Sequence, residues 1–151
     1  MAVSDRPERL ASKPSYLTTQ LARHVQRMVS EAFEETGARG YHYRLLATLD
    51  EVGPTSQAEL GRRADMDRSD VVAAVNELVA AGQVGRAPDP ADARRNVISL
   101  TPAGRRQLQR LDRALERTQD RFLAPLTGRD RERYAALVRT LLDHHESITT
   151  A

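Results

Sequence analysis

The chain has 151 residues, of which 40% are apolar and 29% charged, while aromatic residues make up only 4%. This length fits one domain, and the composition is typical of a helical core packed with Leu, Ala and Val. The absence of cysteine excludes disulfides and thiolate metal ligands within this chain. No apolar run approaches the roughly 20 residues of a membrane span, and the polar stretch from Met1 to Pro7 lacks a secretory apolar segment. We therefore expect no membrane association and a cytoplasmic location.

The net charge is only +2, and the basic residues are nearly all arginine, with Lys13 as the sole lysine. Arginine suits bidentate contacts to phosphates and bases. A genome-wide composition bias would also explain the preference for arginine. The total charge therefore does not indicate whether the protein binds nucleic acid, and the distribution of charge along the chain is more informative.

The N-terminal part of the chain predicts a loose arm, interrupted by Pro7 and Pro14, and then two helices. The first helix runs from Ser15 to about Thr36, where Gly37 ends it. Its apolar stripe comprises Leu17, Leu21, Val25, Met28, Ala32 and Phe33. A second, shorter apolar face consists of Leu45, Leu46, Leu49 and Val52, and Gly53-Pro54 ends that helix.

The next segment predicts two short helices that meet at a tight connection near residues 65–67. Thr55 or Ser56 can cap the first helix, and Glu59 stands three residues after Ser56, as in a capping box. Asp67 and Asp70 are acidic cap signals for the second helix. Its apolar positions are Val71, Val72, Val75, Leu78 and Val79, and Gly82 ends it. The pair has the layout of a helix-turn-helix, although many helical proteins contain such a pair.

The segment after Gly82 predicts a two-stranded hairpin. Residues 84–87 are extended, Pro88-Asp89-Pro90 cannot lie inside a helix, and residues 96–101 alternate and are rich in β-branched side chains. The hairpin tip then spans roughly Asp89 to Arg95. A helix-turn-helix followed directly by a hairpin is a winged helix.

Two long helices complete the chain, one from Pro102 to about Leu123 with Thr101 as its cap, and one from about Arg129 to Glu146. We expect a mainly α-helical fold with a small β-hairpin wing, formed by a single domain over residues 1–151. The winged helix-turn-helix would occupy residues 40–101, and a helical dimerisation region residues 14–37 and 102–147. Dimerisation is expected because one winged helix cannot cover three long amphipathic helices. A stripe such as Leu137, Val138, Leu141 and Leu142 is otherwise more often intramolecular core.

Positive charge gathers at the predicted wing. Residues 86–106 contain five arginines against two aspartates, a local balance of +3 that exceeds the value for the whole chain. A basic hairpin beside a helix-turn-helix fits duplex DNA, because the helix reads the major groove while an arginine tip enters the narrow minor groove. A solvated, charged hairpin tip is the alternative.

In these segments the sequence resembles the multiple antibiotic resistance regulator (MarR) family. The resemblance rests on Asp92-x-Arg94-x-x-x-Ile98-x-Leu100-Thr101-x-x-Gly104, which matches the family's wing signature. It extends upstream to about Gly37 through Gln57-Ala58-Glu59-Leu60, Arg68-Ser69, Leu78, Gly82, Val84 and Arg86-x-Pro88-Asp89. The flanking helices match in layout only. The resemblance implies a DNA-binding transcriptional regulator, usually a repressor, that binds a pseudo-palindromic operator as a homodimer and responds to a small ligand.

Carried over by position, the resemblance assigns contacts with double-stranded DNA to ten residues: Ser56, Gln57, Arg68, Ser69, Ala73, Asn76, Arg86, Asp92, Arg94 and Arg95. Arg68 would bind guanine bidentately, and Asp92 would pair with Arg94, leaving Arg94 or Arg95 for the minor groove. A surface ion pair with Asp65 is the alternative for Arg68. Ala73 and Ala93 depart from the family, which often has arginine or another polar residue at the first position and arginine at the second.

The reading helix over residues 69–83 carries Asp70 and Glu77 and no basic residue. Phosphate neutralisation is therefore expected from Arg62, Arg63, Arg68 and the wing, with modest and strongly salt-dependent affinity. The same acidic helix favours the alternative function, a winged-helix protein-interaction module without sequence-specific DNA binding.

His24, Tyr41 and His42 are candidates for binding a small aromatic or phenolic ligand, which the resemblance places near these elements; local packing and hydrogen bonding are the alternative. His144 and His145 are poorly placed for one metal ion, because adjacent helical residues point about 100° apart. We expect no metal, no cofactor and no enzymatic activity, since no nucleophile, carboxylate pair or phosphate-binding loop stands out.

Overall fold

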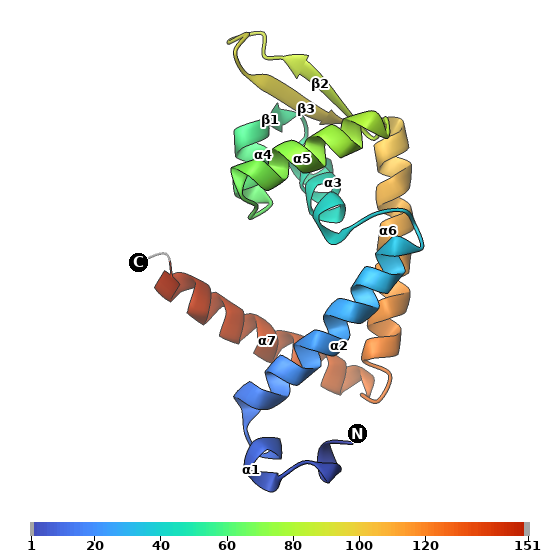
Figure 1. Ribbon diagram of the computed structural model, residues 1–151, viewed down its shortest axis with the longest axis vertical. Helices are drawn as coiled ribbons and strands as arrows, with labels where there is room; N and C mark the ends of the chain where they lie inside the picture. Colours follow the sequence, from blue (N-terminus) through green and yellow to red (C-terminus); the bar gives the residue numbers. More distant parts are fainter. Residues whose placement is uncertain (1, 150–151) are drawn as a thin grey trace. The chain divides into compact units, whose positions relative to one another are not determined.

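The computed structural model describes residues 2–149, which form two compact units that divide after Glu116. The first contains a 3₁₀ helix, Val3–Asp5, followed by α1 (Glu8–Ala11), α2 (Pro14–Glu34), α3 (Gly40–Val52), β1 (Thr55–Ser56), α4 (Gln57–Arg63), α5 (Arg68–Ala80), β2 (Val84–Pro88) and β3 (Asn96–Leu100) (Figure 1). Helix α6 (Pro102–Phe122) begins in the first unit and ends in the second, which also contains α7 (Gly128–Thr149). The expected fold class, mainly helical with a small β wing, is confirmed. The division into reading and dimerisation regions stays a prediction.

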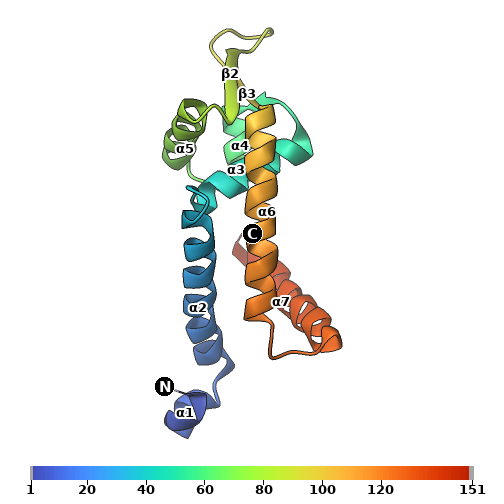
Figure 2. The same cartoon turned by 90° about the vertical axis from the view of Figure 1, so that its right-hand side faces the viewer.

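The strands form an antiparallel sheet in the order β1-β3-β2. Strands β2 and β3 pair from Val84 with Leu100 to Pro88 with Asn96, and their hairpin extends beyond α3, α4 and α5 (Figure 2). Pro88 is tolerated because β2 is an edge strand, where a missing N–H leaves no ladder bond unmade. The expected two-stranded hairpin is present, and β1, which was not predicted, adds a third strand by pairing Thr55 with Ile98. Two residues are too few to show alternation in a sequence.

The core of the first unit joins α3, α4, α5, β3 and α6. Its large side chains that are at most 2% exposed are Phe33, Leu45, Leu46, Leu49, Leu60, Val71, Val75, Leu78, Ile98 and Leu111. Helix α5 contributes three of these from one face, and its opposite face is exposed from Arg68 to Asn76. The apolar spacing of α5 therefore decides which of its side chains reach solvent.

One expectation about the N-terminal part of the chain is wrong, and one about the start of α5 is right in position only. Residues 8–11, predicted to be part of a loose arm, form α1, with Pro7 at its N-cap and the acidic Glu8 in its first turn. Asp67 does occupy the N-cap of α5, but its side chain makes no capping hydrogen bond.

The second unit holds the end of α6 and α7 together by local contacts. The rings of Phe122 and Tyr134 meet edge to face with 5.9 Å between centroids, and Arg131 donates to Asp120 at 3.2 Å. Helix α7 leaves three leucines largely uncovered, because Leu137, Leu141 and Leu142 are 57%, 60% and 55% exposed. None of the helices within residues 2–149 has the length and apolar character that a membrane span requires.

Gly104, in the first turn of α6, explains one position of the wing signature. The Thr101 hydroxyl accepts from the Gly104 N–H at 3.0 Å and donates to the Gly82 carbonyl at 2.7 Å, while the Thr101 N–H donates to the Gln83 carbonyl at 3.1 Å. These bonds bring the backbones so close that a Cβ on Gly104 would lie 1.9 Å from the Gln83 carbonyl oxygen. Only glycine permits this approach.

We predict that Gly104→Ala destabilises the fold by about 3 kcal/mol, because the added methyl group must push two backbones apart. For a domain of this size the melting temperature should fall by roughly 6–12 °C, measured by circular dichroism. Gly40→Ala is the matched control, since its Cβ would meet only Phe33 at an ordinary 4.0 Å. Equal melting temperatures for both variants would contradict the prediction.

Candidate nucleic-acid interface

The turn between α4 and α5 faces the wing across an open hollow of about 690 Å³. Throughout, the wing means β2, β3 and the tip over residues 89–95. The polar residues of the hollow come from the start of α4, the start of α5 and the wing: Ser56, Gln57, Glu59, Arg62, Arg68, Arg94, Arg95 and Asn96. Four guanidinium groups thus share this surface with one carboxylate. Five of the ten predicted DNA contacts lie here, namely Ser56, Gln57, Arg68, Arg94 and Arg95.

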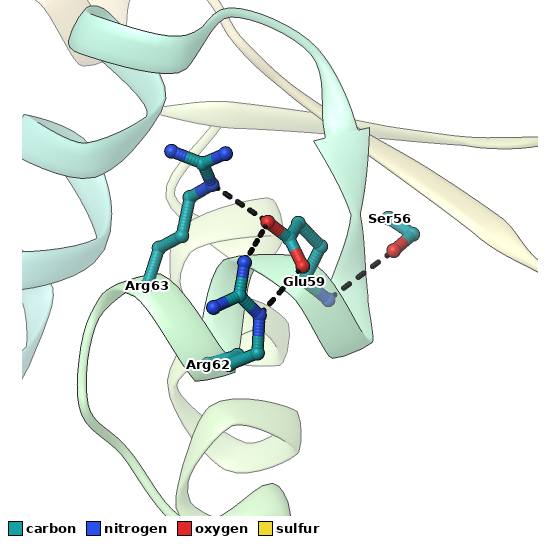
Figure 3. A network of polar contacts seen from close by, with 4 residues as sticks. All are labelled: Ser56, Glu59, Arg62 and Arg63. Carbon is teal, nitrogen blue, oxygen red and sulfur yellow. Dashed lines mark hydrogen bonds and ion pairs between the residues drawn. The ribbon is translucent and has the colours of Figure 1, made fainter.

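Glu59 binds two arginines of its own helix (Figure 3). Its Oε1 accepts from Arg62 at 2.6 Å and from Arg63 at 2.7 Å, and its Oε2 accepts from Arg62 Nε at 2.9 Å. The hydrogen bonds from Arg62 and then Arg63 lower the pKa of Glu59 to about 2. Only half of the expected capping box forms: the Ser56 hydroxyl accepts from the Glu59 N–H at 3.2 Å, but the Glu59 carboxylate turns to the arginines. Arg62 and Arg63, expected to neutralise phosphates, are therefore already paired.

The wing tip is shaped by two aspartates. Asp89 Oδ1 accepts from the Ala91 N–H at 2.8 Å, and Asp92 Oδ1 accepts from the Arg94 N–H at 3.0 Å. Asp92 also lies 3.4 Å from Arg94 Nε and 3.6 Å from Arg95 Nε, so the expected contact with Arg94 is present. The two arginine side chains nevertheless remain 93% and 70% exposed. The aspartates fix the backbone of the tip while leaving the guanidinium groups in solvent.

On the outer face of α5, Arg68, Ser69, Ala73 and Asn76 are all exposed. Within residues 2–149 Arg68 forms no ion pair, so the alternative pairing with Asp65 is not observed. Asn76 is not independent of the wing, because its Oδ1 accepts from Arg86 at 2.6 Å. This bond leaves the Asn76 amide hydrogens to act as donors. Sequence spacing gave no sign of the contact, since the two residues lie on different elements.

Glu77, the second acid of α5, points to α3. Its Oε2 accepts from His42 Nε2 at 2.6 Å and from the Tyr41 hydroxyl at 3.0 Å. His42 Nδ1 accepts from the Arg39 N–H at 3.1 Å, so Nε2 carries the proton shared with Glu77. The bond from His42 and then that from Tyr41 lower the pKa of Glu77, whereas burial and then the bond to Glu77 raise the pKa of Tyr41. One of the two acidic side chains of α5, the predicted reading helix, is thus directed away from the outer face of the helix.

Of the three predicted ligand-binding residues, the structure brings together Tyr41 and His42 and not His24. His24 is exposed on α2 and forms no hydrogen bond with the other two among the described residues. A second polar pair was missed: Tyr43 donates to Asp112 at 3.0 Å, and burial, followed by this bond, raises the pKa of Tyr43. The aromatic run 41–43 was the available signal, but nothing in the sequence paired Tyr43 with a carboxylate 69 residues away.

No group of three or more metal-ligating side chains gathers in the part of the chain that the structure describes. His144 and His145 contact each other ring to ring with centroids 5.1 Å apart. This arrangement offers two nitrogen ligands at most.

Known proteins are similar to this chain in the segments that form the interface described above. The model of the MarR family matches residues 36–95, which span α3 to the wing tip. Over 99 residues the chain is 32% identical to the proposed transcriptional regulatory protein for the hcr operon of Thauera aromatica, which covers 66% of this chain and 60% of that protein. The chain therefore spans less than two thirds of the length of this curated relative.

Solved structures match over more of the chain. PcaV, a transcriptional regulator from Streptomyces coelicolor, is 28% identical with a TM-score of 0.77, covering 90% of this chain and 99% of its own, and it has also been solved with its natural ligand. A mutant of MarR from E. coli in complex with operator DNA has the same fold, with a TM-score of 0.73 at 18% identity over 85% of this chain and 92% of that one. From the family match, the fold and these relatives, we conclude that the chain belongs to the MarR family of winged-helix transcriptional regulators.

Proposed function

We propose that this protein is a DNA-binding transcriptional regulator that holds a pseudo-palindromic operator as a homodimer. The observation that carries the proposal is the joint presentation of the exposed face of α5 and the two solvent-exposed guanidinium groups of the wing tip. A helix of this kind enters a major groove, and arginines of a wing enter the adjacent minor groove, where the negative potential is strongest. Repression, by occupying the operator, is the proposed outcome.

Each predicted contact has a separate proposed role. Arg68 binds guanine bidentately, while Ser69 and Ala73 line the base edges. Asn76 donates to a base or phosphate from an orientation fixed by Arg86. Ser56 and Gln57 contact phosphates beside the hollow. Asp92 acts indirectly, by holding the tip from which Arg94 and Arg95 project.

The proposed dimer rests on the leucines of α7. Leu137, Leu141 and Leu142 form an exposed apolar stripe whose burial against a second copy is favourable by about 25 cal/mol per Å². Two reading heads then enter successive major grooves about 34–36 Å apart. A small ligand that binds better to a different head separation releases the operator by its differential affinity.

For that ligand we propose a small aromatic or phenolic compound that contacts Tyr41 and His42, with His24 as a further candidate. The support is that Tyr41 and His42 hydrogen-bond Glu77 of the reading helix, so a ligand there would act directly on α5. PcaV is a relative that has been solved in complex with its natural ligand. We further infer a cytoplasmic, cofactor-free and non-enzymatic protein.

The alternative, a protein-interaction module, drew its support from the acidic reading helix. Glu77 is engaged by α3, although its side chain remains 52% exposed, whereas Asp70 forms no ion pair among the described residues. A gel shift with the DNA upstream of the protein's own gene, with and without random competitor, separates the two functions. Retention of that fragment against competitor supports the regulator, and no retention in dilute buffer contradicts it.

We predict that Arg94→Ala combined with Arg95→Ala weakens operator binding and reduces its salt dependence. Each lost phosphate contact lowers the slope of log affinity against log salt by about 0.9, so the pair should lower it by about 1.8. Fluorescence anisotropy at several salt concentrations measures this slope. The double variant Arg110→Ala with Arg113→Ala removes the same charge from an exposed face of α6 and should leave the slope unchanged. An unchanged slope in the wing variant would remove the wing from the interface.

We predict that Arg68→Ala relaxes the preference for one base pair of the operator. The loss should amount to about 1–3 kcal/mol at that position, because a bidentate contact to guanine is removed. Binding to a set of operators with single base-pair changes measures it. Equal weakening for every operator would instead make Arg68 a phosphate contact.

We predict that Leu137→Glu combined with Leu141→Glu prevents dimerisation, because two charges would enter an apolar contact. Analytical ultracentrifugation at micromolar concentration should show a monomer, compared with a wild-type dimer. Exchanging two exposed charges on the same helix, Arg133→Glu and Arg139→Glu, tests whether added negative charge alone is sufficient. A dimeric leucine variant would contradict the proposed interface.

A further inference from the structure

Helix α4 presents two arginines that share one carboxylate, so their positive charge is partly compensated before any DNA arrives. Arg62 lines the hollow beside Arg68, Arg94 and Arg95, and its side chain is 70% exposed. Unlike Arg68, it is bound by Glu59 through two hydrogen bonds of 2.6 and 2.9 Å. Arg63 donates to the same carboxylate at 2.7 Å. One carboxylate therefore holds two cations at the edge of the proposed interface (Figure 3).

This bidentate arrangement is the geometry with which arginine binds a phosphate. A DNA backbone that approaches Arg62 must therefore compete with Glu59 for the same N–H groups. The carboxylate also lies among the lining residues of the hollow, where it repels phosphate directly. The hydrogen bonds from Arg62 and Arg63 lower the pKa of Glu59 to about 2, so the side chain is ionised near neutral pH.

We propose that Glu59 limits the affinity of the interface for the DNA backbone by occupying Arg62 and Arg63. This inference rests on the proposed DNA-binding function and deepens it. The effect is independent of sequence, because phosphate contacts carry no base information. Glu59 thereby leaves the contacts of α5 and the wing to decide which duplex is retained. It acts through the arginines and is a positioning residue.

The test replaces Glu59 by Gln and, separately, by Met, two residues that favour helix and match its length. Only variants that keep the wild-type circular dichroism spectrum are used. Binding of a labelled upstream DNA fragment and of a random duplex of equal length is measured between 50 and 200 mM salt. With one more net positive charge at the interface, the salt slope should steepen by about 0.9, so the loss of affinity across this range grows by a further factor of about 3.5. Both duplexes should show the same change.

Two control variants isolate the pairing from net charge. Glu116→Gln removes the same charge from an exposed position on α6 that forms no ion pair within the described residues, and its slope should equal that of the wild type. Adding Arg62→Gln to Glu59→Gln should return the slope to the wild-type value.

The outcomes separate the two levels of the proposal. If the wild type binds DNA and neither Glu59 variant steepens the slope, the role of Glu59 is overturned while the proposed function stands. The same steepening in Glu116→Gln also overturns it, because net charge would explain the effect. If the wild type binds neither duplex at 50 mM salt, the proposed function itself is overturned.

Discussion

The burial of one face of α5 is the constraint on which the proposed interface depends. Val71, Ala74, Val75 and Leu78 pack into the core formed with α3, α4 and β3, and each is at most 2% exposed. Since these positions recur at helical spacing, rotating α5 about its axis would expose them and bury polar side chains at a cost of several kcal/mol. The outward direction of Arg68, Ser69, Ala73 and Asn76 is thus a consequence of packing and needs no DNA to establish it.

Polar contacts then refine what this surface offers. Three acidic side chains are each engaged by neighbours: Glu59 by the arginines of α4, Glu77 by α3 and Asp92 by the wing tip. The contact between Arg86 and Asn76 joins the wing to α5 in the same way. Surface pairs of this kind contribute little to stability, because solvent screens their attraction. Their effect is to select which cations and amides remain available to an anionic partner.

The sequence predicts the elements that have a long apolar period and fails where single contacts decide. Helices α2, α3 and α5 and the paired strands β2 and β3 follow from spacing, capping and turn residues. The two-residue strand β1 does not, because it is too short to show a period and exists only through its pairing with β3. The predicted capping box forms only in part. The carboxylate of Glu59, three residues after Ser56, binds two guanidinium groups in place of the backbone N–H of Ser56. Likewise the partners of Glu77 lie 35 and 36 residues away, and no local pattern joins them.

The fastening of α6 at Thr101 has a mechanical consequence. Through its hydroxyl and its N–H, this residue ties the first turn of α6 to Gly82 and Gln83, two of the three residues that link the end of α5 to the base of the wing. The missing side chain of Gly104 allows the two backbones to touch there. Rotating the first turn of α6 would therefore move α5 and the wing together, as one rigid unit.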